Sequence, residues 1–547
     1  MKGISVSEGI ALGKALVIEE KTINVNKSAA ADCEAEKKLF RRALSAVTAD
    51  IEDDMNTLAA KDNGQDSDEY MLMEAHLMMA SDEEVIERIE RLIENEKISA
   101  SWAVDRVFEE YGAMFEKMED EYLRARSADC ADIRNRILES IQEGGARKIR
   151  KSSEGDENII LVAKELLPSD MLSLDKSLIS GIITEKGSRT SHISILARNM
   201  NIPAIIGADV VGSRVKNGDD VIIYGDTGEF TVRPSKEEID DCILKIREQE
   251  EHVNSLKEYI GKPAETLNGK KVTLLANIGT PDEIQNAADN DAEGIGLFRT
   301  EFLFMDRNDM PSEDEQYEAY KKVSEFFQGR EVIIRTLDAG GDKNIEYLNI
   351  PAESNPFLGY RAIRLCLGRP ELFKIQLRAL LRANTTGNIK IMIPMICNAD
   401  ELKATRKLLQ EAEDELRAEG KQTASARETK VGIMVETPAA AVISDELAKD
   451  ADFFSIGTND LIQYTLASDR MNQNVAYLYD ISHPAILRLI KMTVESAHKA
   501  GIPVGMCGEA GRDPEMIKFL LKNGIDEISM SPGNILKAKS IIRNMSI

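Results

Sequence analysis

The chain has 547 residues, of which 43% are hydrophobic and 30% are charged. This composition is typical of globular domains and excludes a collagen-like, disordered or mostly membrane-embedded chain. The formal net charge of −26 at pH 7 argues against a nucleic-acid-binding protein, because no basic stretch offsets the repulsion from a phosphate backbone.

Six cysteines lie far apart, and none forms a Cys-x-x-Cys pair or a metal-binding spacing with histidine. Such cysteines in a large chain are typical of free thiols in a reducing compartment. The N-terminus carries a charge before any apolar run, and no run of eighteen apolar residues follows. We therefore expect a cytoplasmic protein that is not inserted in a membrane.

The first half of the chain predicts a β/α domain interrupted by helices. Residues 1–23 alternate apolar and polar positions around Gly9 and Gly13, which predicts short strands joined by turns. Residues 24–147 contain almost no Gly or Pro and carry apolar residues at helical spacing, which predicts three or four helices. Apolar runs then return in residues 148–233. The helices are therefore expected to be an all-helical insert in one domain formed by residues 1–23 and 148–233.

A connecting helix and a barrel are predicted next. Ser235 and Glu238 have the spacing of a capping box, so residues 234–263 are expected to form a linker helix. Residues 264–547 contain eight short apolar segments separated by helix-forming sequence, a pattern that predicts a (β/α)₈ or TIM barrel in an α/β multidomain protein. The expected strands are Val272–Ile278, Gly294–Phe298, Val332–Leu337, Ile389–Met395, Val431–Val435, Phe453–Ile456, Val504–Cys507 and Glu527–Met530.

Charged residues follow several of these strands at their C-terminal ends, where the active sites of such barrels lie. Arg299, Arg335 and Arg470 suit bidentate binding of phosphate and carboxylate groups. Glu436 and Asp460 follow neighbouring strands and suit Mg²⁺, which takes its other ligands from water and bound phosphate. The pattern predicts a site for a small, multiply charged anion; the alternative is a set of structural salt bridges.

Two further residues have the chemistry of catalytic groups. Cys507 ends the seventh expected strand in this charged mouth, where a thiol acts as nucleophile or proton donor; the alternative is a small buried apolar residue. His192 follows Thr190 and Ser191, either of which is a good helix N-cap. A helix N-terminus favours neutral imidazole and stabilises negative charge such as a phosphoryl group. A structural histidine is the alternative.

Segments 187–194, 294–302, 335–343, 355–361, 455–470 and 505–509 together resemble Enzyme I of the bacterial phosphotransferase system, in the family's order. The resemblance covers essentially the whole chain. It implies that His192 accepts the phosphoryl group of phosphoenolpyruvate and passes it to the carrier protein HPr, which the helical insert docks. It also implies a homodimer formed through the barrel.

The same resemblance implies roles for the barrel residues. Substrate would be bound by Arg299, Arg335, Arg361, Asn459 and Arg470, Mg²⁺ would be held by Glu436 and Asp460, and Cys507 would protonate the enolate to give pyruvate. One departure concerns the family's Pro-Ser-x-Thr element, whose hydroxyl is thought to orient the catalytic histidine. Here Met171 stands at the threonine position.

Two other functions agree with part of the sequence, that of a related enzyme and that of a non-catalytic regulator. Pyruvate phosphate dikinase and phosphoenolpyruvate synthase share the histidine and barrel domains, but place a large nucleotide-binding domain first, and no Gly-rich phosphate loop precedes His192. A non-catalytic regulator would bind phosphoenolpyruvate without forming pyruvate. Within the insert, the stretch 75–79 contains apolar and sulfur-rich residues and adjoins the acidic residues 82–84, so these residues form either helix core or an exposed docking patch.

Overall fold

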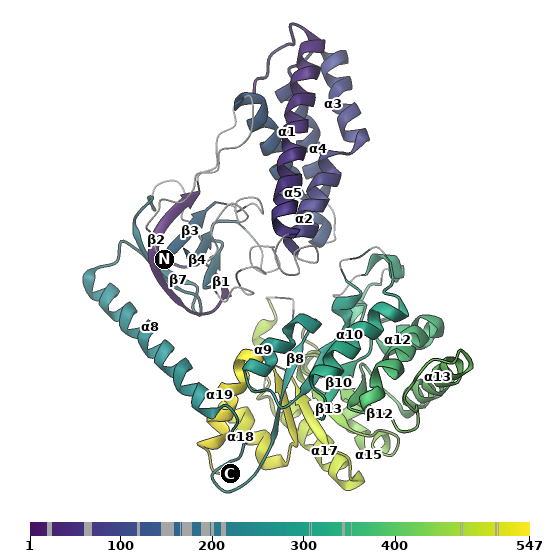
Figure 1. Cartoon of the computed structure of the whole chain (residues 1–547). Helices are drawn as coiled ribbons and strands as arrows, with labels where there is room; N and C mark the ends of the chain where they lie inside the picture. Colours follow the sequence, from purple (N-terminus) through teal and green to yellow (C-terminus); the bar gives the residue numbers. More distant parts are fainter. Residues whose placement is uncertain are drawn as a thin grey trace. The chain divides into compact units, whose positions relative to one another are not determined.

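The computed structural model of the chain has two compact units, Met1–Glu251 and His252–Ile547 (Figure 1). It describes all residues except 19–24, 60–67, 117–120, 144–157, 165, 167–177, 187–196, 198–201, 209–214, 306, 308, 342–344, 352, 471, 473, 509–510 and 512. The predicted site residue His192, its expected caps Thr190 and Ser191, and Met171 lie outside the described residues. Across the described part, no helix combines the length and apolar character needed to span a bilayer.

The helical part of the first unit contains five helices among the described residues, whereas the sequence predicted three or four. They are α1 (Cys33–Ala59), α2 (Asp68–Ala80), α3 (Glu83–Glu96), α4 (Ala100–Glu116) and α5 (Glu121–Glu143). Polar caps rather than Gly or Pro separate α2, α3 and α4. Asp82 caps α3 by accepting bonds from the N–H groups of Glu84 and Val85, and Lys97 ends α3 in the left-handed conformation at φ 53°.

The described residues of the first unit form a sheet of seven strands in the order β1-β5-β4-β3-β2-β6-β7. Their bounds are β1 (Ile4–Ser7), β2 (Ile10–Ile18), β3 (Ile159–Ala163), β4 (Ile179–Thr184), β5 (Ala204–Ile206), β6 (Asp220–Tyr224) and β7 (Glu229–Val232). Strands β2 to β5 run parallel in the middle, and separate apolar clusters cover the two faces of the sheet. Burial on both faces explains why these strands are almost continuously apolar.

The linker helix α8 spans Lys236–Leu256 and is followed by a short 3₁₀ helix, η3 (Lys257–Tyr259). The capping box predicted at its start is present. The Ser235 N–H donates to Glu238 Oε2 at 2.7 Å, and the Glu238 N–H donates to Ser235 Oγ at 3.2 Å.

The second unit is a closed barrel of eight parallel strands, which confirms the predicted fold class. The strands are β8 (Thr273–Ile278), β9 (Ile295–Arg299), β10 (Val332–Arg335), β11 (Ile389–Ile393), β12 (Lys430–Val435), β13 (Phe454–Gly457), β14 (Val504–Cys507) and β15 (Glu527–Met530). Strand β11 ends two residues earlier than predicted, because Met395 has a φ of 59° that breaks the extended backbone.

Helices cover the outside of the barrel. They are α9 (Ile284–Asp289), α10 (Glu313–Phe326), α11 (Ile363–Gly368), α12 (Pro370–Ala383), α13 (Ala399–Ala418), α14 (Pro438–Val442), α15 (Ser444–Leu447), α16 (Thr458–Leu466), α17 (Pro484–Ala500), α18 (Pro514–Asn523) and α19 (Pro532–Arg543). Strand side chains alternate between two cores. Ile334 belongs to the large core that includes residues of the helices, whereas Ile333 belongs to a small cluster with Met392, Met434 and Cys507 from other strands.

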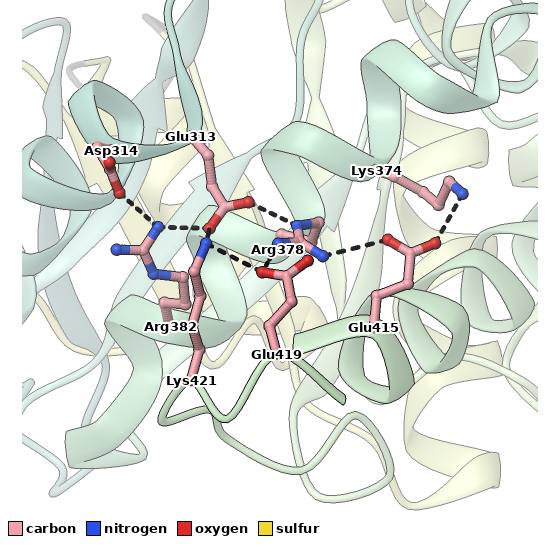
Figure 2. Close-up of polar contacts among 8 residues, drawn as sticks. All are labelled: Glu313, Asp314, Lys374, Arg378, Arg382, Glu415, Glu419 and Lys421. Atoms are coloured by element: carbon pink, nitrogen blue, oxygen red, sulfur yellow. Dashed lines mark hydrogen bonds and ion pairs between the residues drawn. The ribbon is translucent and has the colours of Figure 1, made fainter. Parts of the chain in front are cut away.

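Ion pairs join three of these helices on the outer surface (Figure 2). Arg378 on α12 pairs with Glu313 on α10 at 2.5 Å, with Glu415 on α13 at 3.2 Å and with Glu419 at 2.7 Å. Arg382 and Lys421 add further bonds to Glu313. The side chains of Arg378, Glu313 and Arg382 are largely shielded from solvent, whereas those of Glu415, Glu419 and Lys421 are more exposed. The network ties α10, α12 and α13 to one another.

Candidate active site

Two predicted arginines lie side by side at the C-terminal mouth of the barrel. Arg299 ends β9 and Arg335 ends β10, and the two residues are direct partners across this parallel strand pair. Paired residues on neighbouring strands project to the same face of a sheet. The strand register therefore brings both arginines to the same part of the mouth.

Acidic neighbours fix the buried Arg335 side chain. Its Nη2 donates to Glu301 Oε1 at 2.5 Å, and its Nη1 lies 3.2 Å from Asp338 Oδ2. Burial opposes the positive charge, but Glu301, Asp338 and Glu436 outweigh it and raise the pKa of Arg335 above its usual range. The guanidinium is therefore always charged and held in one orientation.

Arg361 enters the same network from the segment that precedes α11. Its side chain is fully buried, and its Nη2 donates to Asp338 Oδ1 at 2.8 Å. Its Nη1 donates to the Tyr464 hydroxyl at 3.2 Å and lies 3.6 Å from Asp460 Oδ1. Asp338 therefore bridges Arg335 and Arg361, so the two guanidiniums share one counter-charge.

The aromatic ring of Phe357 connects Arg361 with the fourth arginine, Arg470. The Cζ atoms of Arg361 and Arg470 lie 5.9 Å and 6.0 Å from the ring centroid, within the range of cation–π attraction. The Tyr464 hydroxyl donates to the Phe357 carbonyl at 2.5 Å. A Cβ atom at Gly340, where φ is 101°, would lie 2.6 Å from Arg361 Cβ. Only glycine allows this packing.

The two predicted metal ligands are buried carboxylates. Glu436 follows β12 and accepts a bond from the Met395 N–H at 2.6 Å, while Asp460 lies in the first turn of α16. Burial, followed by the charges of Asp460 and Asp338, raises the pKa of Glu436 to about 8. A cation bound beside Glu436 would therefore favour the ionised form of this carboxyl at neutral pH.

The donor set fits a divalent cation. Among the described residues, the buried Oδ1 of Asp460 accepts no hydrogen bond and lies 3.6 Å from Arg361 Nη1, so it has lone pairs left for a bond to a metal ion. No group of three or more His, Cys, Asp and Glu side chains within that part of the chain could hold a metal ion by itself. A cation between Glu436 and Asp460 would therefore complete its coordination with water or a bound phosphate, as Mg²⁺ commonly does.

Cys507 and Asn459 lie at the same mouth. Cys507 ends β14, is 4% exposed, and directs its thiol toward the Ile456 carbonyl at 3.7 Å. Burial is the main effect that raises the pKa of Cys507 to about 11, so the thiol keeps its proton at neutral pH. Asn459 accepts a hydrogen bond from the Tyr479 hydroxyl through Oδ1 at 3.2 Å. Every predicted barrel site residue is thus found at the C-terminal ends of strands β9, β10, β12, β13 and β14 or in the segments that follow them.

Several buried polar atoms in this mouth have no hydrogen-bond partner among the described residues. They are Nε of Arg335, Nε of Arg361, Oγ1 of Thr336, Oγ1 of Thr458 and Oδ1 of Asp460. An unsatisfied buried group costs about 1 to 3 kcal/mol, so such groups are few in structural cores. Buried donors and acceptors that lack a protein partner are expected where a polar ligand binds.

Sequence reasoning did not single out several residues that organise the site: Glu301, Asp338, Phe357 and Tyr464. Local signals existed for two of them. Asp338 comes three residues after Arg335 at a strand end, and Tyr464 lies one helical turn after Asp460 on α16. Neither spacing by itself indicates that the side chains meet Arg361.

Three family profiles match the chain. "PEP-utilising enzyme, N-terminal" matches residues 2–126, "PEP-utilising enzyme, mobile domain" matches 155–228, and "PEP-utilising enzyme, PEP-binding domain" matches 253–547. Among curated relatives, the phosphoenolpyruvate-protein phosphotransferase of Priestia megaterium is 44% identical. Those of Bacillus subtilis (strain 168) and Staphylococcus carnosus (strain TM300) are 43% and 42% identical. Each of these alignments covers 100% of this chain and 94% of the relative.

Proposed function

This chain belongs to the phosphoenolpyruvate-protein phosphotransferase family, and we propose that it transfers the phosphoryl group of phosphoenolpyruvate to its own His192 and then to the histidine of the carrier HPr, releasing pyruvate. The reaction would be the first step of phosphotransferase-system sugar uptake. The observation that carries the proposal is the barrel mouth, where four arginines and two crowded carboxylates gather.

In this proposal the arginines bind the substrate. Phosphoenolpyruvate carries a phosphate and a carboxylate, and planar guanidiniums bind both groups through paired N–H bonds. Arg299, Arg335 and Arg470 would hold these groups, with Arg361 and Asn459 assisting. The acids that pair with Arg335 and Arg361 hold them in place before substrate arrives, which lowers the reorganisation needed on binding.

Glu436 and Asp460 would hold a divalent cation, Mg²⁺, which when bound neutralises charge on the phosphate. Transfer breaks the bond between phosphorus and the enol oxygen and forms a bond between phosphorus and a ring nitrogen of His192. The electron pair released to carbon 3 of the enolate takes the proton of the Cys507 thiol, giving pyruvate. The buried thiol is protonated at neutral pH, as this step requires, and would regain its proton from solvent.

The parts of the chain would divide this work. Residues 1–23 and 148–233 would form the phosphohistidine domain, 24–147 the HPr-binding insert, 234–263 the linker and 264–547 the barrel. We further propose a cytoplasmic homodimer formed through the barrel.

The methionines of α2 differ in exposure, since Met73 is fully buried whereas Met78 is 66% exposed, a few residues before the acidic start of α3. Met78, Glu83 and Glu84 would contact HPr.

The proposal is tested by incubating the protein with phosphoenolpyruvate and Mg²⁺, with and without HPr, while following pyruvate and protein-bound phosphate. We expect one acid-labile phosphate per chain on His192, and catalytic pyruvate formation only with HPr. Label that persists in His192→Ala would contradict the assignment of that residue. Substrate binding without pyruvate would indicate a non-catalytic regulator, and a requirement for a nucleotide would indicate a dikinase or synthase.

A further inference from the structure

Gln376 lies on α12, away from the residues proposed to touch substrate, yet its buried side chain joins the loops that follow β9 and β10. We infer that Gln376 is a positioning residue, which together with the Thr300 hydroxyl fixes the spacing of Arg299 and Arg335. The inference rests on the proposed function, because those arginines are the proposed substrate ligands.

The Gln376 amide is fully used. Its Oε1 accepts from the Leu337 N–H at 2.9 Å, while its Nε2 donates to Thr300 Oγ1 at 3.2 Å and to the Tyr320 hydroxyl oxygen at 3.0 Å. A side-chain amide has one carbonyl and two N–H donors. Since a backbone N–H can only donate, the Leu337 contact assigns the oxygen and nitrogen of this amide without ambiguity.

On both sides of Gln376, the hydroxyl group that accepts a bond from the amide donates its own hydrogen to a further acceptor. Toward the barrel mouth, the Thr300 hydroxyl donates to the Arg335 carbonyl at 2.8 Å. Away from it, the Tyr320 hydroxyl donates to Gln316 Oε1 at 3.1 Å. Thr300, Tyr320 and Gln316 are all fully buried, so water cannot replace a lost partner without rearrangement. The network therefore has a near arm, formed by Thr300 and the Arg335 carbonyl, and a far arm, formed by Tyr320 and Gln316.

The near arm holds the main chain on both sides of Thr336, directly after Arg335. Thr300 directly follows Arg299 and binds the Arg335 carbonyl, while Gln376 binds both Thr300 and the N–H of Leu337. The ends of β9 and β10 are thus tied to each other and to α12. A change in either bond would move one arginine relative to the other.

The pairing of β10 with β9 is irregular immediately before the two arginines. Val332 pairs with Ile295, but two residues later Ile334 pairs with Phe298, so the register shifts just before the arginines. Pairing resumes with Arg335 opposite Arg299, so the ladder places the two residues opposite each other. The Thr300 and Gln376 bonds add side-chain contacts directly after this local distortion, at the position where the two guanidiniums must match one substrate.

Variants of the two arms separate positioning from stability. Thr300→Val removes the hydroxyl at nearly constant volume, and Gln376→Met removes the amide. Tyr320→Phe is the matched control, because it removes one hydroxyl of the same buried network from the far arm only. The variants are compared in the full-length protein by the KM for phosphoenolpyruvate, kcat, thermal unfolding and back-transfer from phosphorylated HPr.

We expect Thr300→Val and Gln376→Met to raise KM for phosphoenolpyruvate by about 10- to 100-fold, since small displacements of binding groups have effects of this order. Thr300→Ser, which keeps a hydroxyl, should restore most of the affinity. Tyr320→Phe should lower the unfolding temperature without raising KM, and back-transfer to His192, which does not use the barrel, should be normal in all variants.

Two results would overturn the inference: a normal KM in Thr300→Val, or an increase in KM for Tyr320→Phe equal to that of Thr300→Val. The second would show that the whole network acts only through stability. Failure of the proposed function is distinguishable, because the unmodified protein itself would then form no pyruvate from phosphoenolpyruvate and Mg²⁺.

Discussion

Gly457, the last residue of β13, gives the carboxylate of Glu436 the space it occupies. A Cβ atom at position 457 would lie 2.9 Å from Cγ of Met434 and 3.0 Å from both Cβ and Oε2 of Glu436. The backbone at Gly457, with φ −89° and ψ 93°, is open to any residue, so the requirement for glycine here is steric and not conformational. The absence of one methyl group on β13 thus determines where the proposed metal ligand on the neighbouring strand sits.

Gly457→Ala should displace the Glu436 side chain by a few tenths of an ångström and lower pyruvate formation by about 10- to 100-fold. Back-transfer from phosphorylated HPr to His192 should continue. Gly533→Ala is the matched control, because a Cβ atom there meets nothing within 4 Å. Normal Mg²⁺-dependent activity in Gly457→Ala would contradict a precise role for the Glu436 carboxylate.

The raised pKa of Glu436 predicts a pH dependence of stability and metal binding. In the metal-free folded protein this carboxyl stays protonated up to about pH 8, whereas its ordinary pKa is 4.5. Its contribution to stability is therefore fully present below about pH 4.5 and is lost as the pH rises through 8. A cation binds the ionised form, so stabilisation by Mg²⁺ should increase from pH 6 to pH 9.

Thermal unfolding at several pH values, with EDTA or with Mg²⁺, measures this linkage. Glu436→Gln should remove both the loss of metal-free stability at high pH and the stabilisation by Mg²⁺. Equal stabilisation by Mg²⁺ at pH 6 and pH 9 would show that Glu436 is not a ligand.

Cys507 should behave as a protonated, unreactive thiol. Because burial raises its pKa to about 11, iodoacetamide at pH 7.5 should label the partly exposed Cys397 well before Cys507. Peptide mapping by mass spectrometry gives this order. Cys507→Ala should slow pyruvate release while leaving substrate affinity largely intact, since the arginines remain. An unchanged turnover rate would remove the proton-donor role.

Charge reversal at the start of α3 tests the proposed HPr contact. Glu83→Lys with Glu84→Lys should lower the rate of phosphoryl transfer to HPr at low salt by roughly tenfold and flatten its salt dependence. Autophosphorylation should be unchanged. The N-cap Asp82 is left intact because it binds two N–H groups of the helix. Glu237→Lys, in the first turn of α8, is the control; equal loss there would indicate a general charge effect.

The ion-pair network of α10, α12 and α13 predicts a stability effect centred on Glu313. Burial opposes its ionisation, but hydrogen bonds from Arg378, Lys421 and Arg382 outweigh it and lower the pKa of Glu313. Its stabilisation is therefore present above its ordinary pKa of 4.5 and is lost as the pH falls. Glu313→Gln should cost about 1.5 to 3 kcal/mol, because three cations lose a shared charged partner although each keeps another acid.

Urea unfolding at pH 7 measures this cost. Asp314→Asn is a matched control, since Asp314 binds the same Arg382 from an exposed position with a side chain that is 79% accessible. The control should lose much less stability. Equal losses for the two variants would show that burial of Glu313 does not matter.

The sequence by itself determined the order of the elements and the chemistry available at the barrel mouth. Apolar strands followed by Arg299, Arg335, Glu436 and Cys507 are local patterns, and closure of eight parallel strands brings such strand ends to one face. His192 remains a prediction from sequence. The predicted number of helices in the insert was too low, because Asp82 and Lys97 begin and end a helix there without Gly or Pro.

Only the tertiary structure decided how these groups are held and charged. Asp338 joins Arg335 and Arg361, and Gln376 reaches Thr300 across 76 positions of sequence. The pKa of Glu436 depends on burial and on Asp460 and Asp338, which come from other strand ends. Hydrogen bonds and desolvation act over a few ångströms in space, and no spacing along the chain encodes which distant residues meet at that range.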